Sequence, residues 1–180
     1  ETEPLLAGTT FPTLTDLVSA DLYAGQALWR SPKLKTAVLR IAYPLGPMGR
    51  GTLANYLGEV RVPMVLGFDP LFQCIHTEDA ATAIVSAVNA KLTGIYNVAG
   101  PAPIPLSSLI RGVDKQPVPI PEKLLPLLLG KFGLSRLPRA SLSHLKYPIV
   151  IDDSVFRAQT GFKFTYDVEQ IMGTFKERSY

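Results

Sequence analysis

The chain has 180 residues, of which 47% are hydrophobic and 18% charged, so it is long and apolar enough to bury a core of its own. The net charge of +3 is spread along the chain without a run of Lys and Arg, which argues against a nucleic-acid-binding surface. The single cysteine, Cys74, excludes an internal disulfide framework and a cysteine-based metal cluster, and it favours a reducing compartment. No apolar run approaches the roughly 20 residues that a membrane helix needs.

The N-terminal segment predicts a loop, a helix and a strand. Residues 1–13 contain Pro and Gly and indicate a loop entered from further upstream, and their acidic start is not typical of a signal peptide. Thr15 and Asp16 can cap a helix that runs to about Trp29. One face of this helix carries apolar residues at helical spacing, namely Leu17, Ala20, Ala24 and Leu28. Asp21 lies in the middle of that apolar face, so a carboxylate points toward the predicted interior.

The next segment favours strands. The near-continuous apolar run TAVLRIA at 36–42 is typical of a strand covered on both faces. It ends in a Pro/Gly-rich stretch, 43–51, that predicts a loop. We expect a short helix at 52–59 and a strand at 60–66, which Pro63 places toward a sheet edge.

A strand–helix–strand unit follows. Residues 71–75 predict a short strand that ends at His76. Thr77 is the expected cap of the most regular helix in the chain, 78–90, with acidic residues in its first turn. Residues 95–98 predict the next strand. The alternation of strands and helices favours an α/β fold with parallel pairing.

The C-terminal part is less regular. Residues 101–121 are too rich in proline to form one regular element. A Leu-rich helix is expected at 122–132, interrupted by Pro126, and two further helices at about 153–160 and 167–178.

Four segments, in this order, resemble the NAD(P)-dependent epimerase/dehydratase family of extended short-chain dehydrogenases/reductases. LKTAVLRIAYPLGP at 34–47 is similar to the family's strand and following loop, and FQCIHTEDAATAIVSAV at 72–88 to its His-containing strand–helix motif. GIYNVAG at 94–100 resembles the last strand, and DDSVFRAQTGFKFTYDVEQIM at 152–172 the C-terminal motif. The ordered set is far more specific than any one of these segments.

The resemblance implies the C-terminal part of a doubly wound, parallel-sheet (Rossmann-like) α/β domain with a small substrate-binding lobe. Residues 1–100 would be the second half of the NAD(P)-binding domain, and 101–180 the lobe and the C-terminal helices. No Gly-rich dinucleotide fingerprint occurs in the chain. NAD or NADP would therefore be bound mainly by residues upstream of this chain.

The catalytic YxxxK pair of this family belongs on the helix before 36–42. Counting along that helix places Leu17 at the Tyr position and Asp21 at the Lys position. Shifting the alignment does not restore the motif, because Tyr23 is followed four residues later by Ala27. Leu17 cannot exchange a proton, and a carboxylate beside a phenol raises its pKa. The resemblance therefore implies an atypical active site, with the catalytic residues unknown.

The resemblance also assigns candidate binding residues. Those on the cofactor side are Asp21, Arg40, Ile41, Ala42 and Tyr43. Those on the substrate side are Tyr43, Leu45 and His76.

Simpler structural roles compete with several of these assignments. Arg40 could pair with a carboxylate at the end of its strand, and Tyr43 could be an apolar wall. His76 could have a structural role, and Asp79 could satisfy backbone N–H groups at the start of its helix. With only two histidines in the chain, we expect no metal site.

The segment 117–147 allows two interpretations. Its Leu-rich turns alternate with basic residues, namely Lys123, Lys131, Arg136, Arg139 and Lys146. It could be the variable lobe that closes over a substrate, or a basic amphipathic surface for lipid or an anionic partner. Pro126 breaks the helix and shortens its apolar run, which favours the lobe.

Three functions stay open from the sequence. The first is a portion of an atypical NAD(P)-dependent epimerase, dehydratase or reductase that acts on a nucleotide sugar or another polar small molecule. The second is a non-catalytic, dinucleotide-binding sensor or scaffold of the same family, and the third is a truncated chain without independent activity. The expected partners are a small-molecule substrate and, as an open alternative, a second copy in a homodimer, in the cytoplasm.

Overall fold

The computed structural model describes residues 15–31, 33–132, 134, 145–148 and 150–177, and it has the mixed α/β architecture that the sequence predicts. The helices are α2 (Thr15–Arg30), α3 (Thr52–Tyr56), α4 (Thr77–Asn89), α5 (Leu106–Gly112), α6 (Leu125–Leu128), α7 (Ser154–Thr160) and α8 (Val168–Lys176). The strands are β1 (Ala37–Ile41), β2 (Tyr43–Leu45), β3 (Arg61–Val65), β4 (Leu71–Phe72), β5 (Cys74–His76), β6 (Gly94–Val98), β7 (Ile104–Pro105) and β8 (Gln116–Ile120). Among the described residues, no helix is both long and apolar enough to cross a membrane.

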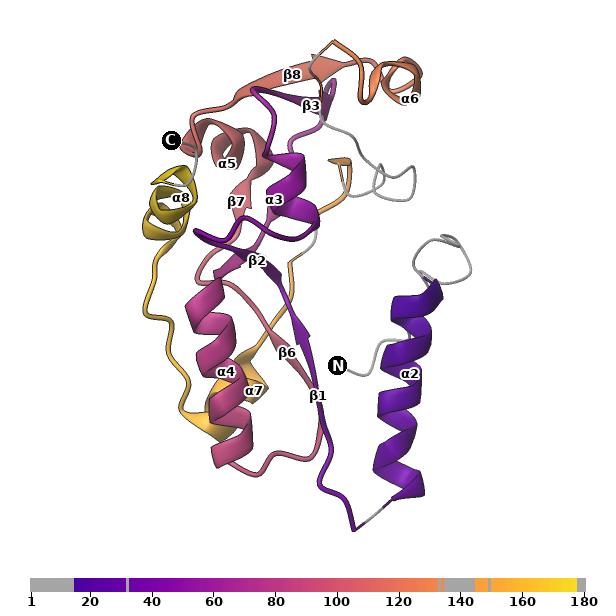
Figure 1. Ribbon diagram of the computed structural model, residues 1–180, viewed down its shortest axis with the longest axis vertical. Helices are drawn as coiled ribbons and strands as arrows, with labels where there is room; N and C mark the ends of the chain where they lie inside the picture. The colour runs from indigo at the N-terminus through magenta and orange to yellow at the C-terminus, as the bar shows by residue number, and fades with distance from the viewer. Residues whose placement is uncertain (1–14, 32, 133, 135–144, 149, 178–180) are drawn as a thin grey trace.

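Parallel pairing of β1 with β6 forms the first sheet and confirms the predicted arrangement of these two strands. The register runs from Ala37 opposite Gly94 to Ile41 opposite Val98. Figure 1 shows α2 on one side of this pair and α4 with α7 on the other. The strand is nevertheless less buried than predicted, because four of the five residues of β1 are half-buried and Ala37 is exposed.

The chain then passes into a second set of strands. β2 pairs in parallel with β5, β3 pairs in parallel with β8, and β4 pairs antiparallel with β7. The β3–β8 pair joins segments that lie more than 50 residues apart in the sequence, and it forms one end of the molecule together with α5 and α6 (Figure 1).

Two hydrophobic clusters hold these layers together. The first joins α3, β3, α5 and α8 through residues such as Leu53, Val62, Leu109 and Ile171. The second joins α4, β6 and α7 through residues such as Ala83, Val98 and Phe156. Segments on both sides of residue 100 contribute to both clusters, so the division into 1–100 and 101–180 stays a prediction.

The strand β5 connects the two clusters. Cys74 belongs to the first cluster and the next residue, Ile75, to the second. Successive side chains of a strand point to opposite faces, so a three-residue strand can pack against both.

Two sequence predictions about elements are corrected. The expected loop 43–51 begins with strand β2, because Tyr43, Pro44 and Leu45 pair with β5. The helix expected at 122–132 is reduced to α6, which is preceded by turns at Pro121 and Glu122. The proline-rich stretch 101–121 holds β7, α5 and β8 in succession, which confirms that it does not form one regular element.

Candidate functional site

The carboxyl ends of β1 and β6 lie side by side because the two strands are parallel. In open α/β sheets, ligands bind at this edge. The backbone N–H of Ala42 donates to the carbonyl oxygen of Val98 over 2.8 Å, which fixes the exit of the chain from β1. Ile41, Ala42 and Tyr43 are all half-buried, so each keeps some surface at the edge.

Tyr43 begins strand β2 directly beyond this edge. Its ring stacks on Phe72, with 5.9 Å between the ring centroids and an angle of 25° between the planes. Burial raises the pKa of the Tyr43 phenol. The side chain is therefore a protonated, half-buried wall residue at neutral pH, with one face on the core.

Asp21 and Arg40 form the most direct contact between α2 and β1. The Nε of Arg40 donates to Asp21 Oδ1 over 3.0 Å, and Nη2 donates to Oδ2 over 2.9 Å. The two side chains are 16% and 22% exposed, respectively, so the pair is only partly shielded from water. This two-point geometry is the one in which a guanidinium binds a carboxylate most strongly.

The ion pair bears on two expectations, one about Arg40 and one about Asp21. Arg40 has the carboxylate partner that the simpler interpretation required, and the carboxylate is the one aligned with the family's Lys. An inward-facing carboxylate requires either a wet cleft, which the helix pattern favours, or a specific donor, and the structure gives Asp21 a specific donor. The side chain of Leu17, at the aligned Tyr position, lies outside the described residues.

Leu45 and His76, both assigned to the substrate side, are each only 1% exposed. Such side chains offer no surface to a substrate, so burial counts against direct contact by either. Leu45 packs in the first hydrophobic cluster. The sequence pattern placed both residues near the loop that follows β1 but could not show how deeply the chain covers them.

His76 has a structural role that the sequence analysis gave to Thr77. It is the N-cap of α4, because its Nδ1 accepts the backbone N–H of Glu78 over 3.2 Å. The ring of His76 also stacks on Tyr166, with 3.7 Å between centroids. Thr is the commoner cap, which is why a residue-type argument chose it.

Asp79 holds the C-terminal segment to α4. This carboxylate is 1% exposed and accepts the backbone N–H groups of Thr165 and Tyr166 over 3.1 to 3.2 Å. We expected Asp79 to satisfy donors of its own helix, and the donors instead come from a segment 86 residues further on. Nearby, the hydroxyl of Tyr166 donates to Glu78 over 2.6 Å, and this bond raises the pKa of the phenol.

Two glycines allow neighbouring segments to approach closely near the carboxyl edge of the sheet. A Cβ at Gly100 would lie 2.0 Å from the carbonyl oxygen of Cys74, and a Cβ at Gly46 would lie 2.6 Å from Thr77 Oγ1. A larger residue would have to move the backbone of Cys74 at the first position and the side chain of Thr77 at the second. The sequence signal was present in the GIYNVAG and YPLGP segments, but it gave no contact partner.

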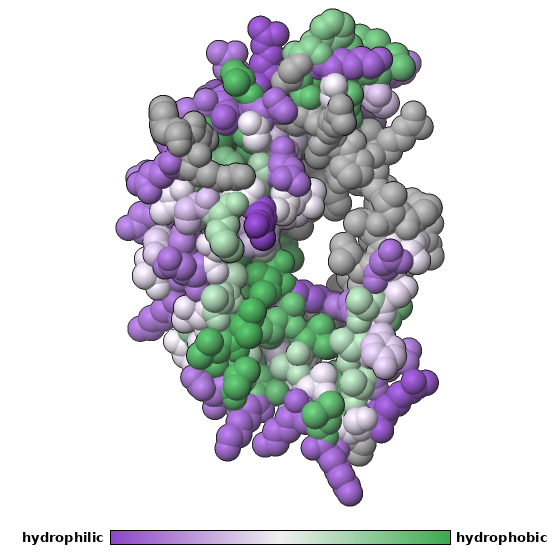
Figure 2. Space-filling model, viewed as in Figure 1, coloured by the Kyte–Doolittle hydropathy of each residue, from purple (hydrophilic) through white to green (hydrophobic). Residues whose placement is uncertain are grey.

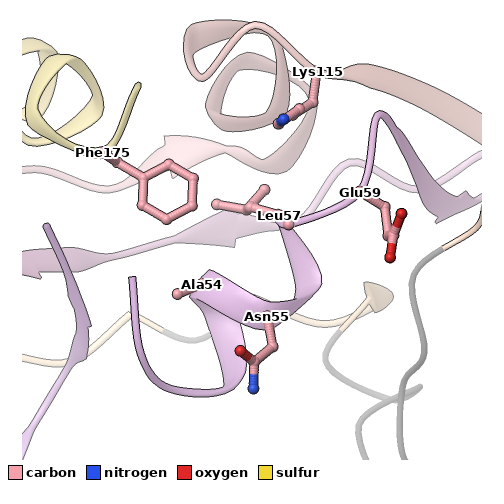
Figure 3. A pocket seen from close by; sticks show the side chains of 7 residues that line it. Ala54, Asn55, Leu57, Glu59, Lys115 and Phe175 are labelled. Atoms are coloured by element: carbon pink, nitrogen blue, oxygen red, sulfur yellow. The ribbon is translucent and has the colours of Figure 1, made fainter. Parts of the chain in front are cut away.

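A surface pocket of about 390 Å³ lies on the first hydrophobic cluster, between α3, α8 and the turn before β8. Figure 3 shows Leu57 at its centre, with Phe175, Lys115, Glu59 and Asn55 around it. None of these residues was predicted to belong to a site. Glu59 and Asn55 are exposed, so the pocket is a shallow polar depression rather than a closed binding cavity.

The basic residue Lys146 contacts an acidic and two aromatic side chains of the same chain. Its Nζ donates to Glu122 over 3.0 Å and lies over the rings of Phe68 and Tyr147, at 5.1 and 5.5 Å from the centroids. These contacts tie Lys146 to side chains of the same chain, and the lobe interpretation of 117–147 stays a prediction. Arg136 and Arg139, on which the lipid-binding alternative also rested, lie outside the described residues.

The residues present fit only part of a dinucleotide. At the sheet edge, Ala42 is small and half-buried, so a ligand can approach the end of β1 there. Asp21 and Arg40 supply polar groups on the α2 side of that edge. A phosphate-cradling Gly-rich turn is absent from the sequence. In the part of the chain that the structure describes, no group of three His, Cys, Asp or Glu side chains could hold a metal ion.

No family model matches the sequence. The chain is 30% identical over 143 residues to an uncharacterized protein of Mycobacterium tuberculosis, and equally to one of Mycobacterium bovis. Each match covers 74% of this chain but only 36% of the relative. The chain therefore spans about a third of the length of the curated relatives it matches.

Solved structures of several enzymes share the fold. RMD from Pseudomonas aeruginosa, complexed with NADPH, superposes with a TM-score of 0.62 at 12% identity, over 90% of this chain and 53% of its own. The dTDP-glucose 4,6-dehydratase from Bacillus anthracis, in complex with NAD, gives 0.59 at 14%, over 90% and 49%. The UDP-N-acetylglucosamine 4-epimerase from Bacillus cereus gives 0.56 at 15%, over 87% and 48%. The predicted Rossmann-like fold class is thereby confirmed.

Proposed function

We propose that these 180 residues are the C-terminal half of an atypical NAD(P)-dependent epimerase, dehydratase or reductase that acts on a nucleotide sugar or another polar small molecule. One observation carries the proposal: about 90% of the chain superposes on roughly half of each of several such enzymes. The parallel β1–β6 pair, whose carboxyl edge leads through Tyr43 into the lobe, supports it.

Within that protein, this chain would supply one wall of the ligand site. The backbone of Ile41 and Ala42 and the ring of Tyr43 would face the nicotinamide half of NAD or NADP at the sheet edge. The cofactor, when bound, would exchange a hydride with the substrate. The pair of Asp21 and Arg40 would fix α2 against β1, so that the wall keeps its shape.

The proton transfer that accompanies a hydride transfer has no evident donor among these residues. Leu17 has no ionisable group, and Asp21 is bound by Arg40. Burial keeps the Tyr43 phenol protonated at neutral pH, which makes it a poor base. We therefore assign proton transfer to residues outside this chain.

A cytoplasmic location and a homodimer remain predictions.

A ligand and turnover experiment on the longer protein tests the proposal. Calorimetry with NAD⁺ and NADP⁺ measures binding, and NMR detection of epimerised or dehydrated UDP- and dTDP-sugars measures turnover. Dinucleotide binding with product formation is expected. Binding without turnover across the sugar panel would favour the non-catalytic alternative, and absence of dinucleotide binding would contradict both.

A further inference from the structure

The segment around α6 has an inward side that is packed on the core. The N–H of Leu124 donates to the carbonyl oxygen of Pro121, and the N–H of Leu134 donates to that of Lys131, so turns lead into and out of the short helix. Leu125 and Leu134 are 1% and 8% exposed and belong to the first hydrophobic cluster. Because these two leucines anchor the segment, the positions of its outward side chains are fixed by the fold.

The outward side of the same segment carries large apolar side chains. Leu124, Leu127 and Phe132 are 48%, 64% and 78% exposed, and we call these three residues the α6 patch. Leu124 and Leu127 share one side of the turn, because the N–H of Leu127 donates to the carbonyl oxygen of Leu124. Phe132 has a φ of +54°, a conformation that bulky L residues rarely adopt. Figure 2 shows apolar residues gathered over α6, at the upper right of the molecule.

Positive charge accompanies the α6 patch. Lys123 and Lys131 flank α6, and both are exposed. Among the ion pairs of the described residues neither lysine takes part, whereas the carboxylate of Glu122 is bound by Lys146 over 3.0 Å. Residues 123–151 contain five Lys and Arg and no Asp or Glu, although the whole chain has 18 basic and 15 acidic residues. The basic residues of this segment are not adjacent, so the local excess of charge becomes visible only when the acidic residues are counted as well.

We infer that the α6 patch docks on the surface of an anionic lipid bilayer. The three apolar side chains would enter the boundary between headgroups and acyl chains, and Lys123 and Lys131 would lie at the level of the lipid phosphates. The attachment would be peripheral, since no helix in the described part of the chain is long and apolar enough to cross a membrane. The inference goes beyond the proposed function, because it concerns a surface at α6 and no contact with a dinucleotide or a sugar.

The chemistry of the patch favours a bilayer over another polyanion. Nucleic acids are held mainly by many basic side chains on their phosphates, whereas here two exposed lysines accompany three large apolar side chains. Leucine and phenylalanine with lysine beside them is the composition of segments that lie in the membrane interface. The inward side of the segment keeps its contacts with the core, so a substrate lobe and a lipid-binding surface can both be built from 117–147.

Co-flotation with lipid vesicles tests the inference on the longer protein. Vesicles of phosphatidylcholine that contain about 30% phosphatidylglycerol should bind the protein at least about 10-fold more tightly than vesicles of phosphatidylcholine alone, because the negative surface attracts the lysines. Equal binding to the two kinds of vesicle would overturn the inference. So would the absence of binding to both, which would mean that the patch is covered or serves another partner.

Substitution of the apolar side chains tests their insertion. Leu127→Ser with Phe132→Ser should weaken binding to the anionic vesicles by about 100-fold or more, because two large apolar side chains no longer leave water. Leu34→Ser with Met48→Ser is the matched control, since both residues are exposed apolar positions outside the α6 patch, and it should leave binding within about twofold. Unchanged binding of the Leu127 and Phe132 variant would overturn the inference.

Substitution of the lysines tests the charge and leaves the packing alone, so it decides the matter even where the serine pair lowers the melting temperature. Lys123→Gln with Lys131→Gln should weaken binding to the anionic vesicles by about 20-fold, or roughly fivefold for each charge. Lys91→Gln with Lys163→Gln removes the same charge from exposed positions after α4 and α7, and binding should stay within about twofold. An equal loss in both variants would mean that only net charge matters and would overturn the inference.

A nucleic-acid partner makes a different prediction. If double-stranded DNA in solution binds the longer protein as tightly as the anionic vesicles do, and the serine pair weakens neither interaction, the segment is a general polyanion site and the inference is wrong. None of these measurements involves a dinucleotide or a sugar. Lipid binding can therefore hold even when the longer protein binds neither, and failure of the proposed function is distinguished from failure of this inference.

Discussion

Asp79 and Asp21 are both acidic residues on helices, α4 and α2 respectively, but the molecule holds them in different ways. Asp79 is 1% exposed and accepts N–H groups from Thr165 and Tyr166, so the chain's own C-terminal segment completes its surroundings. Asp21 keeps 16% of its side chain exposed and relies on Arg40 alone among the contacts described here. The difference indicates that the surroundings of Asp79, between α4 and α8, are finished within these 180 residues, while the ion pair on the α2–β1 side stays partly open to water.

The largest effect is expected on the finished side, at the crossing of Gly100 and Cys74. Gly100→Ala should destabilise the chain by about 3 kcal/mol or more, because the added Cβ would meet a backbone carbonyl at 2.0 Å. Denaturant unfolding followed by circular dichroism measures it. Gly173→Ala in α8 is the control: no atom lies within 4 Å of its Cβ position, and a change within about 1 kcal/mol is expected. An equal effect of the two substitutions would contradict the close crossing.

The second effect sharpens the comparison directly. Asp79→Ala should cost about 2–3 kcal/mol in the free energy of unfolding, because two backbone donors lose their buried acceptor. Asp69→Ala is the matched control. Asp69 also accepts two hydrogen bonds from a distant segment, the N–H and the hydroxyl of Ser107, but it is exposed. We expect about 1 kcal/mol there, and a larger loss at Asp69 than at Asp79 would invert the argument.

The third effect is smaller because water reaches the ion pair. A double-mutant cycle with Asp21→Asn and Arg40→Met should give a coupling free energy of about 1 kcal/mol in the 180-residue chain. The same cycle in the longer protein should give more, because additional cover would exclude water from the pair. An identical coupling free energy in both proteins would contradict the proposed contrast between the surroundings of Asp79 and those of the Asp21–Arg40 pair.

The smallest expected effect is a null result. The 180-residue chain titrated with NAD⁺ or NADP⁺ should show no binding at micromolar concentrations, because it lacks the turn that would cradle the phosphates. Calorimetry measures it. A dissociation constant in the micromolar range or tighter would show that the α2–β1 side is already complete.

Local sequence patterns predicted most elements of the fold. The periodic run 78–90 became α4, the apolar run 36–42 became β1, and the two C-terminal helices appear at nearly the predicted bounds. These elements form because their own residues repeat with the period of the structure they adopt.

Two of the failures involve partners distant in the chain, and one is a local choice between neighbouring side chains. The strand β2 forms in a Pro/Gly-rich stretch only because β5 lies beside it. The cap of α4 is His76 rather than Thr77. Which of the two residues caps the helix depends on which side chain lies within hydrogen-bonding distance of the backbone N–H of Glu78. Spacing also predicted that Asp21 faces inward, but the donor that meets it, Arg40, comes from the next element.

The sequence could predict where the candidate site lies but not which of its residues are buried. The resemblance located Ile41, Ala42 and Tyr43 at the strand end, where the structure leaves them half-buried. It could not tell that Leu45 and His76 are covered, because their burial depends on contacts with the first hydrophobic cluster and with Tyr166, which lie far away in the sequence. A pattern of residue types carries no information about that closure.

The single buried cysteine, Cys74, can serve as a labelling probe for opening of the core. Burial raises the pKa of this thiol to about 12, and the side chain is 1% exposed, so a thiol reagent finds almost no reactive thiolate in the native state. Because β5 lies between the two hydrophobic clusters, labelling requires that they separate, and the single cysteine gives one unambiguous signal. The labelling rate therefore measures the free energy needed to part the two halves of the core.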